Sequence, residues 1–255
     1  MVEVLRLSGL TVGLPGHAPL IDGLSLSLTA GQRIGLVGAS GCGKSLSAAA
    51  ICGLLRPPAA IRAGSLAILG QEMTGAGPAR WRRLRGTGVF QIFQSPGTAL
   101  APARRVGAQL AEAARRAQTD PRRAVADALD MVSLGREVAG LFPYQLSGGM
   151  KQRALIAMAM ILRPAVLIAD EPTTGLDVLT ERDVLCALRA MTEETGAALL
   201  FISHDLRAVG RVTERVMVME VGRLVAEGTV AGLRRAASPA ARRLAEAAHA
   251  LQEPC

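Results

Sequence analysis

A glycine-rich octet at residues 38–45 is the feature that most restricts the folds open to this chain. It consists of Gly38, Ala39, Ser40, Gly41, Cys42, Gly43, Lys44 and Ser45. This order fits the pattern GxxxxGK[ST], and it stands between an apolar run at residues 32–37 and an Ala-rich helical pattern at residues 45–55. A strand, a glycine turn and a helix in this order predict an α/β chain, because the turn lets backbone N–H groups converge on an anion at the helix N-terminus.

The anion expected in such a loop is a nucleotide phosphate. Lys44 is expected to reach the β- and γ-phosphates, and Ser45 to supply a hydroxyl ligand for Mg²⁺. Cys42 is interpreted as a small side chain at a permissive position of the loop. The loop alone does not identify the class of protein, because kinases, GTPases and transport ATPases share it.

An acidic pair follows a second buried strand. The apolar run at residues 166–169 is followed by Asp170, Glu171 and Pro172. This order places two carboxylates at the carboxyl edge of the sheet, beside the phosphate loop. Consecutive side chains on a strand point in opposite directions. We therefore expect Asp170 to face Mg²⁺ and its waters, and Glu171 to act as general base toward the attacking water.

The remaining sequence indicates strands and helices in alternation, with one helical insertion. Further strands are expected at residues 2–7, 24–29, 65–69, 197–202 and 216–220, and further helices at residues 106–117, 122–132, 148–162, 179–192, 206–212 and 238–251. The first two strands are expected to form an antiparallel edge, and the later ones a mainly parallel sheet covered on both faces. We predict a core of residues 1–94 and 161–235, an inserted helical subdomain of residues 95–160, and a C-terminal helix in residues 236–255.

Composition argues against several other classes of protein. The 255-residue chain has no uninterrupted apolar run of the roughly 18 residues that a spanning helix needs, and its N-terminus lacks the pattern of a secretory signal. The four cysteines form no CxxC pair, so neither a disulfide framework nor a metal cluster is indicated. The net charge of +8 comes from scattered arginines, and one Trp, one Tyr and four Phe are few for base stacking. We therefore predict a cytoplasmic protein that binds no nucleic acid.

A third motif indicates a family. Residues 146–153 read Leu-Ser-Gly-Gly-Met-Lys-Gln-Arg and resemble the signature sequence of ABC ATPases. Ser147 and the N–H groups of Gly148 and Gly149 open a helix and form a second anion site. This site cannot reach the chain's own phosphate loop, so it is expected to serve the ATP of another chain.

Three further residues match motifs of the same family. Gln94 in residues 89–96 resembles the Q-loop, Asp177 after Gly175 and Leu176 resembles the D-loop, and His204 resembles the switch histidine. The resemblance implies that Gln94 joins the core to the helical subdomain and senses Mg²⁺ or water. It also implies that Asp177 contacts an opposing subunit and that His204 touches the γ-phosphate.

One position departs from the family pattern. These ATPases usually stack adenine on an aromatic residue in the early antiparallel sheet. Residues 11–21 of this chain offer only Leu14, Pro15 and His17 for that purpose. The sequence therefore does not identify the residue that holds the base.

The family resemblance implies an architecture and a set of partners. The fold would be a P-loop NTPase (RecA-like) core with an N-terminal antiparallel β part and an inserted helical subdomain. Two such ATPase subunits, either copies or sister chains, would enclose ATP and Mg²⁺ beneath two transmembrane permease subunits. The chain would lie peripherally on the cytoplasmic face of the inner membrane, with a substrate-binding protein as an indirect partner. Residues 94–106 are expected to dock a cytoplasmic helix of a permease.

Non-catalytic positions indicate a subfamily. Residues 92–96, 142–146 and 171–178 resemble the peptide/nickel importer subfamily. The short chain and the missing early aromatic are most similar to its nickel-import type (NikD type), so uptake of nickel or a nickel chelate is the first interpretation. Di- or oligopeptide or opine import is the alternative. An exporter ATPase and a soluble ABC ATPase that acts on nucleic acid or ribosomes are further alternatives.

Overall fold

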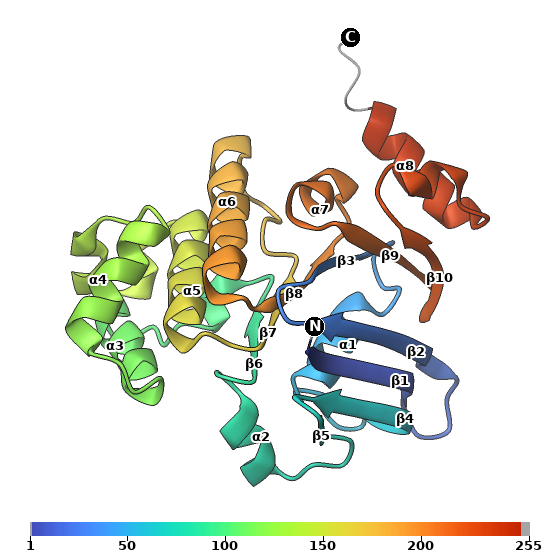
Figure 1. Ribbon diagram of the computed structural model, residues 1–255, viewed down its shortest axis with the longest axis horizontal. Coiled ribbons are helices and arrows are strands. Elements are labelled where there is room, and N and C mark those ends of the chain that lie inside the picture. Colours follow the sequence, from blue (N-terminus) through green and yellow to red (C-terminus); the bar gives the residue numbers. More distant parts are fainter. Residues whose placement is uncertain (1, 251–255) are drawn as a thin grey trace.

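The computed structural model describes residues 2–250 and arranges them around two sheets (Figure 1). The larger sheet has the strand order β10-β9-β3-β8-β7-β6. Its strands are β3 (Arg33–Gly38), β6 (Val89–Ile92), β7 (Val166–Asp170), β8 (Ala198–Ser203), β9 (Arg215–Glu220) and β10 (Arg223–Gly228). Neighbouring strands are parallel, except that β10 is antiparallel to β9. The carboxyl ends of β3, β7 and β8 therefore meet at one edge, where a ligand site is expected in an open α/β sheet.

The smaller sheet is antiparallel and has the order β2-β1-β4-β5. Its strands are β1 (Glu3–Gly13), β2 (Pro19–Thr29), β4 (Ala60–Ile68) and β5 (Gln71–Glu72). The first two strands pair as the sequence predicts, but they do not form an edge of the parallel sheet. Strand β1 pairs with β2 on one side and with β4 on the other, so these strands build a sheet of their own.

Strand β8 shows how the larger sheet is buried on both faces. Leu199 and Phe201 pack into a core with the helical layer, whereas Leu200 and Ile202 pack into a second core with the smaller sheet. This alternation is the period of a strand covered on both sides. Helix α1 (Lys44–Ile51) contributes to the second core, so it is held between the two sheets.

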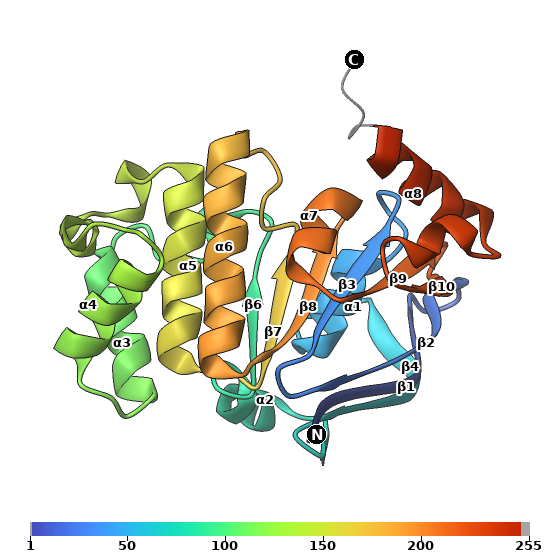
Figure 2. The ribbon, with the colours of Figure 1, turned by 45° about the horizontal axis from the view of Figure 1, so that its top comes forward.

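The other helices lie on both sides of the parallel sheet: the first, with Trp81 and Leu84, joins the second core, and the rest form a layer beside and over the opposite face. They are α2 (Pro78–Leu84), α3 (Val106–Arg116), α4 (Pro121–Met131), α5 (Gly148–Leu162), α6 (Val178–Thr195), α7 (Leu206–Val212) and α8 (Pro239–Ala250). Helices α3, α4 and α5 pack against one another, and α5 also packs along α6 (Figure 2). The helical subdomain expected from the sequence is therefore present, while its division from the core at residues 95 and 161 stays a prediction.

Four short elements are absent from the sequence prediction. Strand β5 has two residues, β6 has four, and α2 has seven residues of which three are arginines. Strand β10 is half-buried at most positions and lacks a strong apolar pattern. Strands this short are set by their pairing partners more than by local pattern. Within residues 2–250, no helix combines the length and the apolar character needed to cross a membrane.

Candidate functional site

The phosphate loop forms the turn between β3 and α1. Gly43 precedes the helix with φ 113°, a conformation that would strain any side chain. Gly38 is restricted by space, because a Cβ there would lie 2.2 Å from the carbonyl oxygen of Met219. Lys44 is buried, and its Nζ donates to the carbonyl oxygens of Gly38 and Ala39 at 2.9 and 3.0 Å. Its ammonium group is thus held against the loop that the sequence assigns to phosphate.

Ser45 and Asp170 meet at the carboxyl edge of the parallel sheet. Asp170 is the last residue of β7, and the Ser45 hydroxyl donates to its Oδ1 at 3.0 Å. Burial raises the pKa of the Asp170 carboxyl and the neighbouring Glu171 charge adds to this, whereas the Ser45 hydrogen bond lowers it in part. A hydroxyl beside a carboxylate is an oxygen donor pair that suits Mg²⁺. Of the three residues predicted to bind Mg²⁺, Ser45 and Asp170 are hydrogen-bonded to each other, and Gln94 lines the same cavity as Ser45.

Glu171 lies just beyond the end of β7, with φ 48° in the left-handed region. The expectation that Asp170 and Glu171 diverge by alternation along a strand is therefore wrong, because a left-handed turn redirects Glu171. Its backbone N–H donates to the carbonyl oxygen of Ile202 at 2.9 Å. Its carboxylate accepts a hydrogen bond from the Thr174 hydroxyl at 2.8 Å and lies 2.9 Å from Nδ1 of His204.

One cavity of about 470 Å³ brings half of the predicted site residues together. It is lined by Leu20, Ser40, Gly41, Gly43, Lys44, Ser45, Leu46, Gln94, Glu171 and His204. Gln94 reaches it from the loop after β6, and His204 from the end of β8. The His204 side chain is 62% exposed and that of Glu171 is 10% exposed, so the acid lies beneath the histidine.

Leu20 is a lining residue that sequence reasoning misses. It lies near the start of β2, its side chain is 44% exposed, and its carbonyl oxygen would lie 3.3 Å from a Cβ on Gly43. The residues considered for the base, Leu14, Pro15 and His17, are not among those that line this cavity. The available signal was a bulky apolar residue directly after a segment that contains Gly16 and Pro19.

The signature loop lies apart from this cavity. Ser147 caps α5, and its Oγ accepts a hydrogen bond from the Met150 N–H at 3.2 Å. Asp177 caps α6 by accepting from the N–H of Thr180 and from its hydroxyl, and these bonds hold the pKa of the Asp177 carboxyl below its usual value. The two caps belong to helices in contact, because Gly149 packs closely on Thr180. Ser147, Gly148 and Asp177 are exposed and Gly149 is buried between the two helices, and none of the four lines the cavity at the chain's own phosphate loop.

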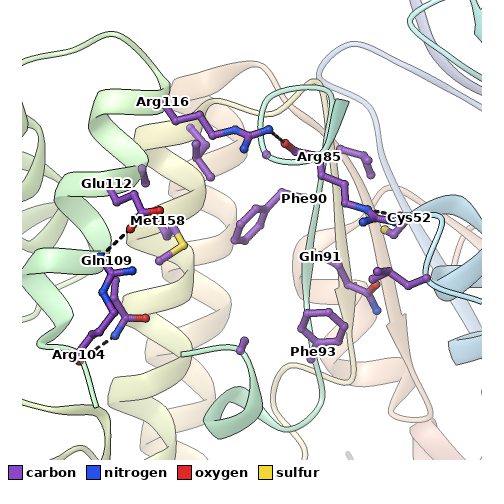
Figure 3. Close-up of a pocket in the computed structure, with 16 residues that line it drawn as sticks. Cys52, Arg85, Phe90, Gln91, Phe93, Arg104, Gln109, Glu112, Arg116 and Met158 are labelled. Atoms are coloured by element: carbon purple, nitrogen blue, oxygen red, sulfur yellow. Dashed lines mark hydrogen bonds and ion pairs between the residues drawn. The ribbon is translucent and has the colours of Figure 1, made fainter. Parts of the chain in front are cut away.

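A second cavity, of about 460 Å³, lies between β6 and α3 (Figure 3). Phe90 and Phe93 give it an apolar wall, and the arginines at positions 85, 104 and 116 surround it. Arg104 pairs with Glu112 at 2.6 Å. Because Phe93 directly precedes Gln94, this cavity and the phosphate cavity are connected through adjacent residues of one loop.

Comparison with known proteins identifies relatives along most of the chain. A family model described as ABC transporter matches residues 21–174. The probable D,D-dipeptide transport ATP-binding protein DdpD of Escherichia coli (strain K12) is 39% identical over 226 residues, which cover 86% of this chain and 69% of that protein. The glutathione import ATP-binding protein GsiA of Salmonella typhimurium is 39% identical over 243 residues, covering 89% of this chain and 39% of that protein. A putative peptide import ATP-binding protein of Brucella ovis is 38% identical, covering 82% and 66%.

Solved structures share the fold. The ATP-binding cassette MJ0796, a dimer in a post-hydrolysis state bound to ADP and Pi, aligns with a TM-score of 0.77 at 23% identity, covering 88% of this chain and 98% of that one. The protein cbiO1 of Clostridium perfringens aligns with a TM-score of 0.79 at 22% identity, covering 99% and 100%. These likenesses confirm the expected α/β fold with its antiparallel part and helical subdomain. The family model and the 39% identical relatives show that the chain belongs to the ABC transporter family, as one of its ATP-binding and ATP-hydrolysing cassettes.

Proposed function

We propose that this chain is the ATPase subunit of a peptide-type importer, which couples ATP binding and hydrolysis to uptake of a small peptide. The observation that carries the ATPase role is the cavity shared by Lys44, Glu171 and His204. The substrate class is supported by relatives whose names refer to D,D-dipeptide, glutathione and peptide transport. Nickel uptake, the first interpretation of the sequence, has no such support, since none of these names refers to nickel.

The chain's own residues suit hydrolysis of a terminal phosphate. Lys44 would turn from the two loop carbonyls toward the β- and γ-phosphate oxygens. Ser45 and Asp170 would hold Mg²⁺, which offsets the charge that develops on the phosphates. Glu171 would accept a proton from the attacking water while the water oxygen bonds to the γ-phosphorus and ADP leaves.

His204 and Glu171 are in direct contact in the site. Both carboxylate oxygens of Glu171 lie within 3.0 Å of the histidine Nδ1, and Oε2 also accepts from Thr174. A general base needs a free oxygen within reach of the water. We propose that the γ-phosphate attracts His204, which releases the Glu171 carboxylate for the proton transfer.

A second ATPase subunit completes the site in this proposal. Ser147 lies apart from the chain's own cavity, and the two residues after Asp177, Val178 and Leu179, are 80% and 75% exposed. Bulky apolar side chains exposed beside a helix cap favour a protein contact. A copy of this chain or a sister chain would cover them and place its nucleotide against the Ser147 loop.

The second cavity is the proposed docking site for a permease. The segment expected for docking, residues 94–106, supplies Ala99 and Arg104, and the other lining residues come from β6, α3, α5 and neighbouring loops. An apolar wall surrounded by arginines suits a helix with apolar and acidic side chains. Docking there would hold the chain on the cytoplasmic face of the inner membrane, with the substrate-binding protein as an indirect partner.

The test uses the chain reconstituted in lipid with its co-encoded membrane and sister subunits. We expect wild type to hydrolyse MgATP, and Glu171→Gln to bind ATP while losing hydrolysis by about 100-fold or more. Glu137→Gln, at an exposed glutamate of the helical subdomain, is the matched control and should retain wild-type turnover.

The substrate is tested with the binding protein of the same system. Stimulation of hydrolysis by binding protein loaded with dipeptide or glutathione would support peptide import. Stimulation by a nickel chelate alone would overturn the substrate assignment and leave the ATPase intact. Unchanged turnover in Glu171→Gln would remove Glu171 as the base.

A further inference from the structure

Gln152 of α5 connects three segments that are distant in sequence. Its side chain is 2% exposed and lies in the second turn of the signature helix. Its Nε2 donates to the carbonyl oxygen of Pro172 at 2.8 Å and to that of Phe93 at 3.3 Å. The two hydrogens of one amide group allow both bonds. A single side chain therefore joins the signature helix to the loop after β6 and to the segment after β7.

Both carbonyl groups belong to residues next to the site. Phe93 precedes Gln94, and the planar peptide unit that carries the Phe93 carbonyl also carries the Gln94 N–H, so the two groups turn together. Pro172 follows Glu171, and its ring fixes φ, so holding its carbonyl restrains the chain on the exit side of Glu171. Glu171 has φ 48°, a conformation that a residue with a side chain keeps only where its surroundings impose it.

The carbonyl oxygen of the Gln152 amide indicates that this residue does more than fill space in the core. Its Oε1 is buried and has no hydrogen-bond partner among the described residues. A buried acceptor without a partner destabilises a fold, so an apolar side chain of similar length would suit the packing alone better. The two donated hydrogen bonds are therefore the feature that glutamine supplies here and an apolar residue could not.

We propose that Gln152 is a positioning residue that transmits movement of α5 to Gln94 and Glu171 at the same time. This inference rests on the proposed function, in which Glu171 is the general base and the Ser147 loop at the start of α5 contacts ATP held by another subunit. A displacement of α5 then reaches both site residues through one amide group. Gln152 touches no reacting atom and acts through the backbone on either side of the site.

The test replaces Gln152 with methionine in the reconstituted complex. Methionine keeps the length of the side chain and removes both donors. We expect kcat for MgATP hydrolysis to fall about 10- to 100-fold while KM stays within about 2-fold, because misplacement of the reacting groups affects the chemical step. Gln32→Met is the matched control: Gln32 accepts from the Thr29 N–H at 3.0 Å at the opposite end of β3, so its kcat should equal that of wild type.

Two further measurements separate positioning from a merely structural role. Thermal unfolding should show Gln152→Met folded, because the loss of the unpaired buried Oε1 offsets part of the cost of leaving the Pro172 and Phe93 carbonyl groups without a donor. Gln94→Ala should lower kcat much less in the Gln152→Met background than in wild type, because both changes act on the same loop. The inference would be overturned if Gln152→Met left kcat unchanged or changed KM instead of kcat. It would also be overturned if the effects of Gln152→Met and Gln94→Ala on kcat were fully additive. An inactive wild-type complex would instead overturn the proposed function, and this inference with it.

Discussion

Replacing Gly149 with alanine is expected to destabilise the fold, whereas the same change at Gly148 is not. A Cβ on Gly149 would lie 2.0 Å from Cγ2 of Thr180, well inside van der Waals contact. A Cβ on Gly148 would lie 3.5 Å from Cδ2 of Leu176, which is an ordinary contact. The two glycines are adjacent in the signature loop, and they differ because Gly149 lies where α5 meets α6.

Two opposing effects set the size of the difference. Alanine in place of glycine at a helical position gains up to about 1 kcal/mol, because it restricts the unfolded chain. Overpacking a close contact costs about 1–3 kcal/mol when the neighbours must move. Gly148→Ala should therefore be neutral or stabilising. The free energy of unfolding of Gly149→Ala should be about 1–3 kcal/mol lower than that of Gly148→Ala. Both variants share the helical gain, and only Gly149→Ala has the overpacking cost.

Thermal unfolding of the ligand-free chain measures this difference. For a domain of this size, about 1 kcal/mol shifts Tm by about 2–4 °C. Thr180→Ser tests the cause, because it removes Cγ2 and keeps the hydroxyl that donates to Asp177 Oδ2 at 2.7 Å. In that background Gly149→Ala should lose most of its penalty. Equal Tm values for the two alanine variants, or a penalty that persists with Thr180→Ser, would refute the steric explanation.

Three other predictions concern the site and the cysteines. Asp170→Asn should raise the Tm of the ligand-free chain at neutral pH, because burial raises the pKa of Asp170 and ionisation therefore opposes folding. The gain should vanish as the pH falls to the unfolded-state pKa, and a lower Tm for the variant at neutral pH would contradict it. Maleimide should label the exposed Cys186 in the folded protein, and should label Cys52 only after the protein unfolds, because burial raises the pKa of the Cys52 thiol to about 12. Peptide mapping of the label checks this. Leu20→Ser should weaken ATP binding by about 3- to 10-fold in calorimetry through lost apolar contact, whereas the equally exposed Leu69→Ser outside the cavity should leave Kd unchanged.

Helices α5 and α7 show what could be predicted from sequence. Both have the bounds expected from the pattern, at residues 148–162 and 206–212. Each start is marked by a capping side chain, since Ser147 and Asp205 accept hydrogen bonds from N–H groups of the first turn. Helix α5 also ends at Arg163, which has φ 47° and precedes a proline. Local start and stop signals of this kind can be identified without knowledge of tertiary contacts.

Strands β6 and β10 show what could not be predicted. Strand β6 has four residues including Gln91, and its extended conformation depends on pairing with β7, which is far along the chain. Strand β10 follows a tight turn in which Val221 and Gly222 both have positive φ, and its register depends on β9. A short strand whose partner supplies most of its stability has no periodic pattern of its own.

The candidate site divides in the same way. Lys44, Ser45, Gln94, Glu171 and His204 belong to sequence motifs, and the structure places all five around one cavity. Leu20, Thr174 and Gln152 have no role assigned by a motif: Leu20 and Gln152 reach their places through contacts between distant segments, and Thr174 through the local turn that follows Glu171. Residue type and spacing thus identify groups that carry chemistry, whereas the residues that orient those groups require the fold.

Glu171 is identified by its sequence motif, but its orientation depends on the fold. An acid after the β7 strand can be recognised from sequence, but the direction of its side chain depends on a positive φ that Ile202, Pro172 and Thr174 help to impose. The same geometry that departs from strand alternation presses the carboxylate against His204. The Thr174 hydroxyl and the His204 ring both contact this carboxylate, so its orientation is fixed from two sides. In this chain the turn that places the acid therefore also sets which side chains surround it.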